Sequence, residues 1–133
     1  MHRAEHKIAG TPCAIKVITK EKLRETKVYL DLMKNELECL EALEHPHIVR
    51  VYELLEDNQN IYVVLELIEG GNLLETITKI QSQKLSFTER DAANIIYQVM
   101  LALNYMHTRR TMHRDLKLEN LLVEFEKDEA GQT

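Results

Sequence analysis

The sequence has little of what marks several common protein classes. It contains two cysteines, Cys13 and Cys39, and no Cys-x-x-Cys pair. A disulfide framework is therefore not expected, and a reducing, cytoplasmic setting fits this composition. No apolar run approaches the roughly 20 residues that cross a bilayer, and the N-terminus shows no signal-peptide core. We therefore expect no membrane partner.

Glycine is also scarce, with four residues in a chain of 133. None of them forms a Gly-x-Gly-x-x-Gly phosphate-binding loop, and no Asp-x-Asp-x-Asp-Gly loop indicates calcium binding. The net charge of −5 argues against a nucleic-acid partner, which would require a basic surface. A content of 44% hydrophobic and 29% charged residues is typical of a globular domain.

Histidines occur in pairs, but their spacing does not favour a metal site. A proline separates His45 from His47, which matches neither helical nor finger-type ligand spacing. We interpret this segment as a turn that leaves a helix. His107 and His113 are a similarly weak pair of metal ligands.

Apolar residues recur at intervals of three and four in two stretches, which predicts two amphipathic helices. The first runs from about residue 21 to residue 44. Its apolar face consists of Leu30, Met33, Leu37 and Leu40. The second follows Thr88, which is expected to cap it together with Asp91. Its apolar stripe is expected to pack in a core and consists of Ala92, Ile95, Ile96, Val99, Met100, Leu103 and Met106.

Short runs rich in β-branched and apolar residues predict strands. These runs are residues 2–8, 13–18, 49–55 and 61–67. The last is nearly all apolar, so we expect it to be buried on both faces. A polar hairpin turn is expected before it. Two glycines, Gly70 and Gly71, then allow a turn into a short helix predicted for residues 72–81.

The most specific motif follows the second long helix, where residues 113–120 read His-Arg-Asp-Leu-Lys-Leu-Glu-Asn. This resembles the catalytic loop H-R-D-L-x-x-x-N of protein kinases. An ordinary charged loop is the alternative, but the five residue types of this motif, and Lys117 as a sixth, fall at the expected spacing. The resemblance implies that Asp115 accepts the substrate's proton, that Lys117 neutralises the moving phosphoryl group and that Asn120 binds Mg²⁺.

A second part of the resemblance lies in the strand at residues 13–18, where Cys-Ala-Ile-Lys is similar to the kinase V-A-I-K. It implies that Lys16 holds the α- and β-phosphates of ATP and that Ala14 packs on the adenine. The family pattern E-x₃-L-x₂-L-x-H-P-x-I-V matches the chain from Glu36 onward. Glu36 is therefore expected to pair with Lys16.

The same resemblance implies the remaining contacts of ATP. Leu65 would stand at the back of the adenine pocket and Leu122 would form its floor. The carbonyl of Glu66 and the amide of Ile68 would hydrogen-bond the adenine. ATP and Mg²⁺ are thus the expected cofactors.

The implied fold is α+β and protein-kinase-like, but incomplete. Residues 1–67 would form most of the small β-rich lobe and residues 68–72 the hinge and the start of the next helix. Residues 73–133 would form the first helices and the catalytic loop of the large lobe. The glycine-rich loop, D-F-G and A-P-E are absent from the sequence, so the chain is expected to be a partial domain that is inactive alone.

The resemblance also suggests a subgroup. Lys117 is typical of serine/threonine kinases, and the sequences around residues 5–10 and 87–93 are similar to the calcium/calmodulin-dependent and calcium-dependent kinases. This implies a protein substrate and a calcium-sensor regulator outside this chain. Glu119 favours basic substrates, while Asn72 stands where many such kinases have an acidic residue. The alternative function is a non-catalytic interaction module built on a kinase-like fragment.

Overall fold

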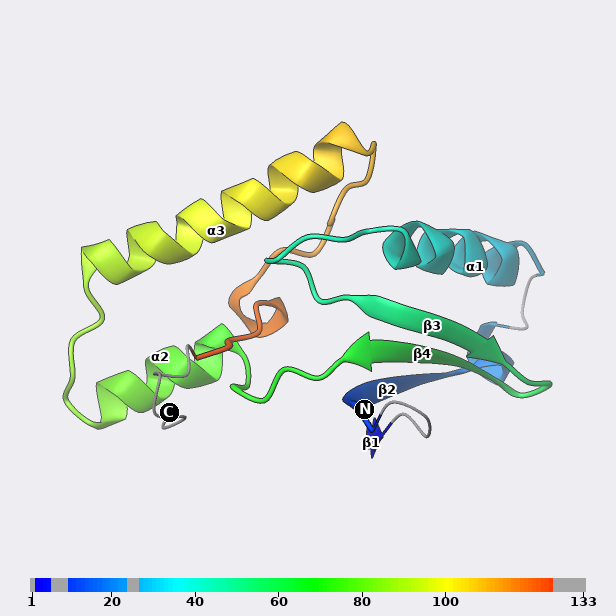
Figure 1. Cartoon of the computed structure of the whole chain (residues 1–133), viewed down its shortest axis with the longest axis horizontal. Helices are drawn as coiled ribbons and strands as arrows, with labels where there is room; N and C mark the ends of the chain where they lie inside the picture. The colour runs from blue at the N-terminus through cyan, green and yellow to red at the C-terminus, as the bar shows by residue number, and fades with distance from the viewer. Residues whose placement is uncertain (1, 6–9, 24–26, 126–133) are drawn as a thin grey trace. The chain divides into compact units, whose positions relative to one another are not determined.

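The first part of the chain forms a four-stranded antiparallel sheet in the order β1-β2-β4-β3 (Figure 1). The structure, a computed structural model, describes residues 2–5, 10–23 and 27–125. The strands are β1 (His2–Glu5), β2 (Pro12–Thr19), β3 (Val51–Glu56) and β4 (Asn60–Glu66). All four predicted strands are therefore present, with ends displaced by a residue or two. The predicted continuation of the first strand over residues 6–8 lies outside the described residues.

β3 begins at Val51 rather than at residue 49, because the preceding turn has not yet ended. The amide of Ile48 still donates to the carbonyl of His45 at 3.1 Å, and the amide of His47 donates to Nδ1 of His45 at 3.0 Å. These two bonds close the turn that was predicted at the two histidines. The sheet ladder then starts with Val51 opposite Leu65.

β4 lies between β2 and β3, but its buried residues lie on only one of its two faces. Ile61 and Val63 are buried, whereas Tyr62 and Val64 on the other face are half-buried. The expectation of burial on both faces was therefore wrong for this strand. An antiparallel strand commonly packs one face on the core and leaves the other partly solvated.

The β3–β4 hairpin is closed by Asp57. Its Oδ1 accepts hydrogen bonds from the amides of Gln59 and Asn60, each at 2.7 Å, and its Oδ2 accepts one from the Tyr62 hydroxyl at 2.7 Å. The Tyr62 hydroxyl, and then the two amides, hold the pKa of Asp57 below its ordinary value, because they stabilise the carboxylate. A single ionised side chain thus fixes the turn that was predicted here.

We expect the stability of the hairpin to decrease in acid because of Asp57. A pKa that is lower in the folded state contributes stability above the unfolded-state pKa of about 3.9, and this contribution is lost as the pH falls through the folded-state pKa. Asp57→Asn should therefore flatten the decline of stability below about pH 4, as measured by urea denaturation at a series of pH values. Asp31→Asn on the exposed surface of α1 is the control. If the free energy of unfolding fell equally steeply with decreasing pH in wild type and in Asp57→Asn, this assignment would be contradicted.

One helix accompanies the sheet, and it is shorter than predicted. A 3₁₀ turn, η1 (Lys20–Leu23), follows β2, and α1 spans Lys27–Glu41. Residues 24–26, inside the predicted helix, lie outside the described residues. α1 packs against β3. The residues of its predicted apolar face, Leu30, Met33, Leu37 and Leu40, are all half-buried, and Lys34 beside them is the other half-buried residue of the helix.

The rest of the chain forms two helices, each started by a reciprocal side-chain cap. α2 spans Leu73–Ser82 and α3 spans Glu89–Thr108. At α3, the Thr88 hydroxyl accepts from the Asp91 amide at 3.1 Å and the Asp91 carboxylate accepts from the Thr88 amide at 3.0 Å. The predicted cap and both helices are confirmed.

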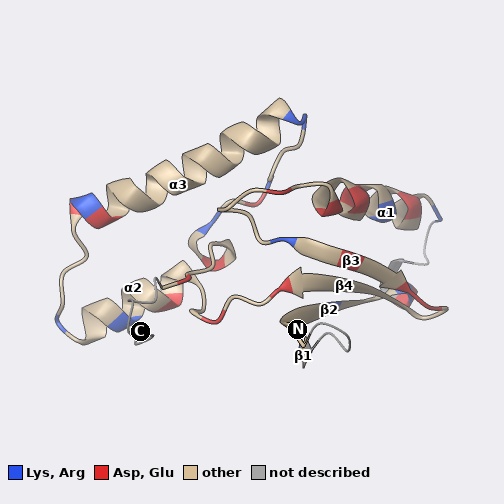
Figure 2. Ribbon diagram, viewed as in Figure 1, with Lys and Arg blue, Asp and Glu red and all other residues tan. Residues whose placement is uncertain are grey.

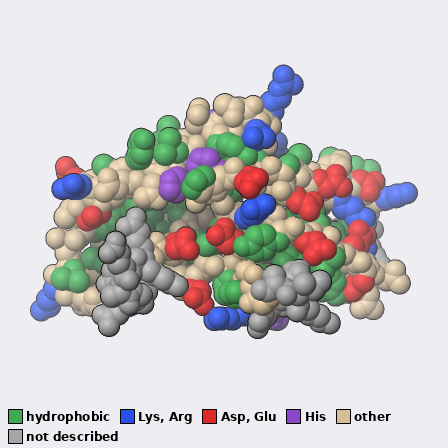
Figure 3. Space-filling model, in the orientation of Figure 1, with side chains coloured by type: hydrophobic (Ala, Val, Ile, Leu, Met, Phe, Trp, Pro, Cys, Tyr) green, Lys and Arg blue, Asp and Glu red, His purple; other side chains and the backbone are tan. Residues whose placement is uncertain are grey.

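The apolar stripe of α3 is not uniformly buried. Met106 is buried and Ile95, Val99 and Leu103 are half-buried, but Ile96 and Met100 are each 58% exposed. Core packing for every member of the stripe was therefore wrong, because none of the described residues covers this side of the helix. Figure 2 shows no charged residue along α3 between its first turn and the arginines that follow its last residue, and Figure 3 shows hydrophobic side chains lying at the surface where it runs.

The chain separates into two compact units, Met1–Leu67 and Ile68–Thr133, and each is described by itself. Strands and α1 form the first unit, and the remaining helices form the second. The α+β class predicted from the sequence is confirmed. Among the helices of the described residues, none combines the length and the apolar character needed to cross a bilayer.

Removing the cap of α3 should loosen its first turn. Thr88→Ala deletes the hydroxyl that accepts from Asp91 and should cost about 1 kcal/mol, detected as faster hydrogen exchange at the first amides of α3. Thr78→Ala is the matched control, because its hydroxyl lies inside α2 and only donates back to the Leu74 carbonyl. Alanine favours the helix interior, so this control should be neutral or stabilising. A similar loss of stability in Thr88→Ala and Thr78→Ala would count against the stabilising role of the cap.

Candidate active site

The pairing of β2 with β4 brings three predicted ATP-contacting residues to one face of the sheet. Ala14 lies opposite Leu65 and Lys16 lies opposite Val63. Residues directly opposite in an antiparallel pair share a face, as do residues two apart on one strand. Ala14 is buried and Leu65 is half-buried, so the two form an apolar patch on this face, and Lys16 is exposed beside it.

Glu36 lies on α1 beside the half-buried stripe rather than opposite to it. It comes three residues after Met33 and four before Leu40, so helical spacing places it at one border of the stripe. The side chains of Glu36 and Lys16 are both exposed, and within the described part of the chain no ion pair joins them. The Lys16–Glu36 pair stays a prediction.

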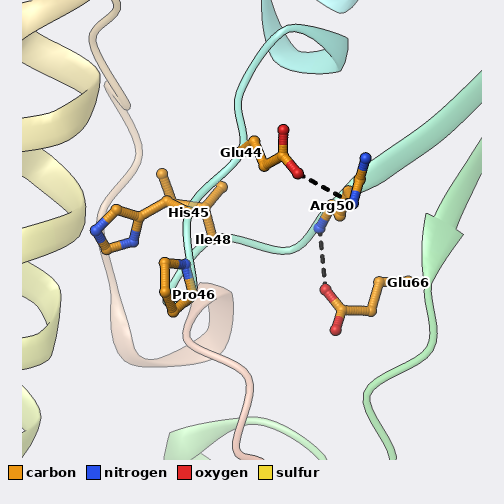
Figure 4. A pocket seen from close by; sticks show the side chains of 6 residues that line it. All are labelled: Glu44, His45, Pro46, Ile48, Arg50 and Glu66. Carbon is orange, nitrogen blue, oxygen red and sulfur yellow. Dashed lines mark hydrogen bonds and ion pairs between the residues drawn. The ribbon is translucent and has the colours of Figure 1, made fainter.

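Glu66, at the end of β4, uses its side chain within the sheet. The amide of Arg50 donates to its Oε2 at 3.2 Å, and the Arg50 guanidinium pairs with Glu44 at 3.2 Å (Figure 4). These residues line a pocket together with the turn at His45 and Pro46. The Glu66 carboxylate thus has a structural contact within this unit, while the contact with a nucleotide that the resemblance implies is made by the backbone carbonyl.

The Ile68 amide remains available for such a backbone contact. β4 ends at Glu66, and Ile68 lies two residues further along the chain. Among the described residues, no backbone carbonyl accepts a hydrogen bond from this amide. An amide of this kind is a ready hydrogen-bond donor.

The side chains of the H-R-D loop converge on Asp115. The amide nitrogen of Asn120 donates to the Asp115 carbonyl at 2.8 Å and to its carboxylate at 3.0 Å. The Lys117 ammonium lies 3.6 Å from the same carboxylate oxygen. All three residues are exposed. The structure thus gathers the predicted proton acceptor, the predicted phosphoryl contact and the predicted metal ligand into one cluster.

The backbone of this loop adopts an unusual conformation at Arg114, whose φ is +67°. Left-handed conformations cost a non-glycine residue roughly 1–2 kcal/mol and are concentrated at functional sites. The Asp115 amide also donates to Nδ1 of His113 at 3.2 Å. His113 is exposed, and this bond braces the loop.

The loop is followed by a short segment that pairs with the start of α2. η2 (Leu118–Asn120) ends the loop, after which the Leu121 carbonyl accepts from the Leu73 amide at 2.8 Å. The Val123 amide donates to the Gly71 carbonyl at 2.9 Å, and Leu122 bridges to Asn72. α2 also packs against η2. Leu122, the predicted floor of the adenine pocket, is 46% exposed in this arrangement.

Asn72 has a role that the sequence reasoning missed. Its side chain accepts from the Glu75 amide at 2.9 Å, while the Glu75 carboxylate accepts from the Asn72 amide at 3.3 Å. This is a capping box, and the signal for it was present as an asparagine followed three residues later by a glutamate. The residue that departs from the acidic pattern of related kinases therefore starts α2.

Metal ligands are few in the described residues. No group of three or more histidines, cysteines, aspartates or glutamates gathers there in a way that could hold an ion. Neither hydrogen bond of Asn120 uses its Oδ1, so this oxygen remains available beside the Asp115 carboxylate. Hard oxygens are the ligands that Mg²⁺ prefers. Oδ1 of Asn120 would supply one ligand of a magnesium site, and the remaining ligands would have to come from elsewhere.

The cluster around Asp115 and the sheet face that carries Ala14, Lys16 and Leu65 point to one class, the phosphoryl-transferring kinases. The family model described as "Protein kinase domain" matches residues 1–130. The chain belongs to this family.

Curated relatives extend the likeness to the subgroup suggested by the sequence. The calcium/calmodulin-dependent protein kinase type 1 of Macrobrachium nipponense is 43% identical over 109 residues, covering 82% of this chain and 30% of that protein. The calcium-dependent protein kinase 5 of Plasmodium falciparum is 40% identical over 120 residues, which cover 90% of this chain and 20% of that protein. The CBL-interacting protein kinase 33 of rice, Oryza sativa subsp. japonica, is 38% identical over 115 residues, which cover 86% of this chain and 24% of that protein. The chain thus spans less than a third of the length of each of these three relatives.

We expect Gly70 to be required for the segment that follows the loop at residues 113–120. A Cβ on Gly70 would lie 1.8 Å from the Val123 carbonyl oxygen, so the pairing could not persist unchanged. Gly70→Ala should destabilise this unit by about 1–3 kcal/mol, measured by urea denaturation. Gly71→Ala is the comparison, since its φ of +74° makes alanine unfavourable by conformation and its added Cβ would meet only the movable end of Glu75. Gly70→Ala should be the more damaging, and the reverse order would refute the close-approach argument.

Proposed function

We propose that the protein transfers phosphate from ATP to serine or threonine residues of protein substrates. The observation that carries this proposal is the convergence of Asn120 and Lys117 on Asp115. Phosphoryl transfer depends mainly on positioning and charge stabilisation, and this cluster supplies both. Lys117 supports the serine/threonine assignment, as does the likeness of this chain to a calcium/calmodulin-dependent and a calcium-dependent protein kinase.

Each residue of the cluster has a definite task in this proposal. Asp115 accepts the hydrogen bond of the substrate hydroxyl and orients it toward the phosphorus. Lys117 stabilises the negative charge on the transferred group. Asn120 holds the Asp115 carboxylate in place through its amide nitrogen and offers Oδ1 to the magnesium ion. Magnesium would neutralise phosphate charge during the transfer.

The nucleotide would be held by residues of the sheet and of the segment after it. Lys16 would contact the α- and β-phosphates and Glu36 would pair with Lys16. The apolar face of Ala14 and Leu65 would pack on the adenine from one side and Leu122 from the other. The backbones of Glu66 and Ile68 would hydrogen-bond its edge.

The chain tested by itself should be inactive. The sequence contains no glycine-rich loop to cover the phosphates and no D-F-G aspartate. Asn120 would then be the one protein ligand offered to magnesium, and one neutral oxygen binds Mg²⁺ poorly. The alternative of a non-catalytic interaction module does not explain why Lys16, Glu36, Asp115, Lys117 and Asn120 are all present.

A chimera provides the direct test. In it, this chain replaces the matching segment of the Macrobrachium nipponense relative, which is 43% identical to it. The chimera should transfer labelled phosphate from ATP to serine or threonine of a general protein substrate, and the isolated chain should not. Asp115→Ala should lower kcat by roughly 10²–10⁴ because the proton acceptor is lost, with nucleotide binding largely retained.

The controls separate chemistry from folding. The intact relative is the positive control, and Asp31→Ala in the chimera removes a carboxylate from the exposed surface of α1 without touching the loop. A folded chimera that transfers no phosphate would overturn the proposed function. Activity of the isolated chain that depends on Asp115 would overturn its expected inactivity.

A further inference from the structure

One carboxylate in the first unit joins three structural elements. The Lys20 ammonium donates to Oε1 of Glu56, and the Lys34 ammonium donates to the same oxygen at 2.8 Å. Lys20 also donates to the Asp57 carbonyl at 2.6 Å. Glu56 is the last residue of β3, Lys20 follows β2 directly, and Lys34 lies on α1. We call Lys20, Lys34 and Glu56 the three-residue clamp.

The two lysines of the clamp differ in burial and therefore in function. Lys20 is only 9% exposed, and its backbone amide also donates to the Gln59 carbonyl at 2.8 Å, so it is part of the hairpin. The side chain of Lys34 is 36% exposed and its one described contact is with Glu56. Lys20 thus fixes Glu56 to the sheet, while Lys34 ties the helix to the fixed carboxylate. The two bonds together hold the pKa of Glu56 below its ordinary value, Lys20 having the larger effect.

The position of Lys34 on α1 determines what this tie controls. Lys34 comes four residues after Leu30 and three before Leu37, at one border of the half-buried stripe. Glu36 lies at the opposite border. A tie at one border opposes rotation of the helix about its own axis, and that rotation sets the direction in which Glu36 points.

We propose that Lys34 and Glu56 are positioning residues, which set the rotation of α1 and thereby the approach of Glu36 to Lys16. Lys16 lies on β2 four residues before Lys20, so the clamp connects the strand that carries Lys16 to the helix that carries Glu36. This inference rests on the proposed function, in which Lys16 contacts the phosphates of ATP. Neither Lys34 nor Glu56 touches substrate or nucleotide in this scheme.

The test compares three lysine variants in the chimera described above. Lys34→Met removes the charge but keeps most of the apolar stem, and leaves the Lys20–Glu56 bond intact, so the hairpin remains closed. Lys34→Arg keeps the charge and the reach to Glu56. Lys27→Met makes the same change at an exposed position of the same helix and is the matched control.

Two readouts are expected to move together. Lys34→Met should raise the KM for ATP about two- to fivefold, the range of one partly exposed ion pair, with the KM for the protein substrate unchanged. It should also accelerate hydrogen exchange in α1 but not in β4. Lys34→Arg and Lys27→Met should behave as wild type. A general loss of folding would instead lower kcat through the active fraction and leave the KM for ATP unchanged.

The outcomes separate this inference from the proposed function. If the folded chimera is inactive in every form, the proposed function fails, and exchange in α1 still reports whether Lys34 holds the helix. If the chimera is active and Lys34→Met changes neither the KM for ATP nor exchange in α1, the positioning role is overturned. It is also overturned if Lys27→Met has the same effect as Lys34→Met, or if Lys34→Arg fails to preserve wild-type values.

Discussion

The antiparallel pairing of β2 with β4 is the constraint on which the first unit depends. It sets Ala14 opposite Leu65 and Lys16 opposite Val63, and a shift by one residue would turn each of these side chains to the other face. At one end of this pairing, the amide of Lys20, directly after β2, donates to the Gln59 carbonyl in the hairpin that Asp57 closes. This pairing decides which side chains lie on each face of the sheet, and α1 packs against a sheet whose faces are fixed in this way.

Local signals allowed much of this fold to be predicted from the sequence. The Thr88–Asp91 cap and the apolar face of α1 depend on residues only a few positions apart, so the sequence pattern predicts both. The cluster around Asp115 could be predicted for the same reason, because its partners Lys117 and Asn120 lie two and five residues away in the sequence.

Features that depend on distant pairing were not predictable. Glu56 joins lysines that are 36 and 22 residues away in sequence, and nothing in the pattern distinguishes it from other exposed glutamates. The need for a glycine at position 70 arises from the backbone of Val123. Exposure of Ile96 and Met100 was missed because periodicity shows which face of a helix is apolar, not whether anything covers that face.

The bond pattern of Asn120 explains why the residue at this position is an amide. One nitrogen donates to both the carbonyl and the carboxylate of Asp115. A carboxylate would be as good a ligand for a cation, but it has no hydrogen to donate and would repel Asp115 at this distance. An amide offers a donor to one neighbour and an oxygen to another without adding charge. The two ends of the loop are thereby mechanically linked, so substitutions at positions 115 and 120 should have effects that do not add.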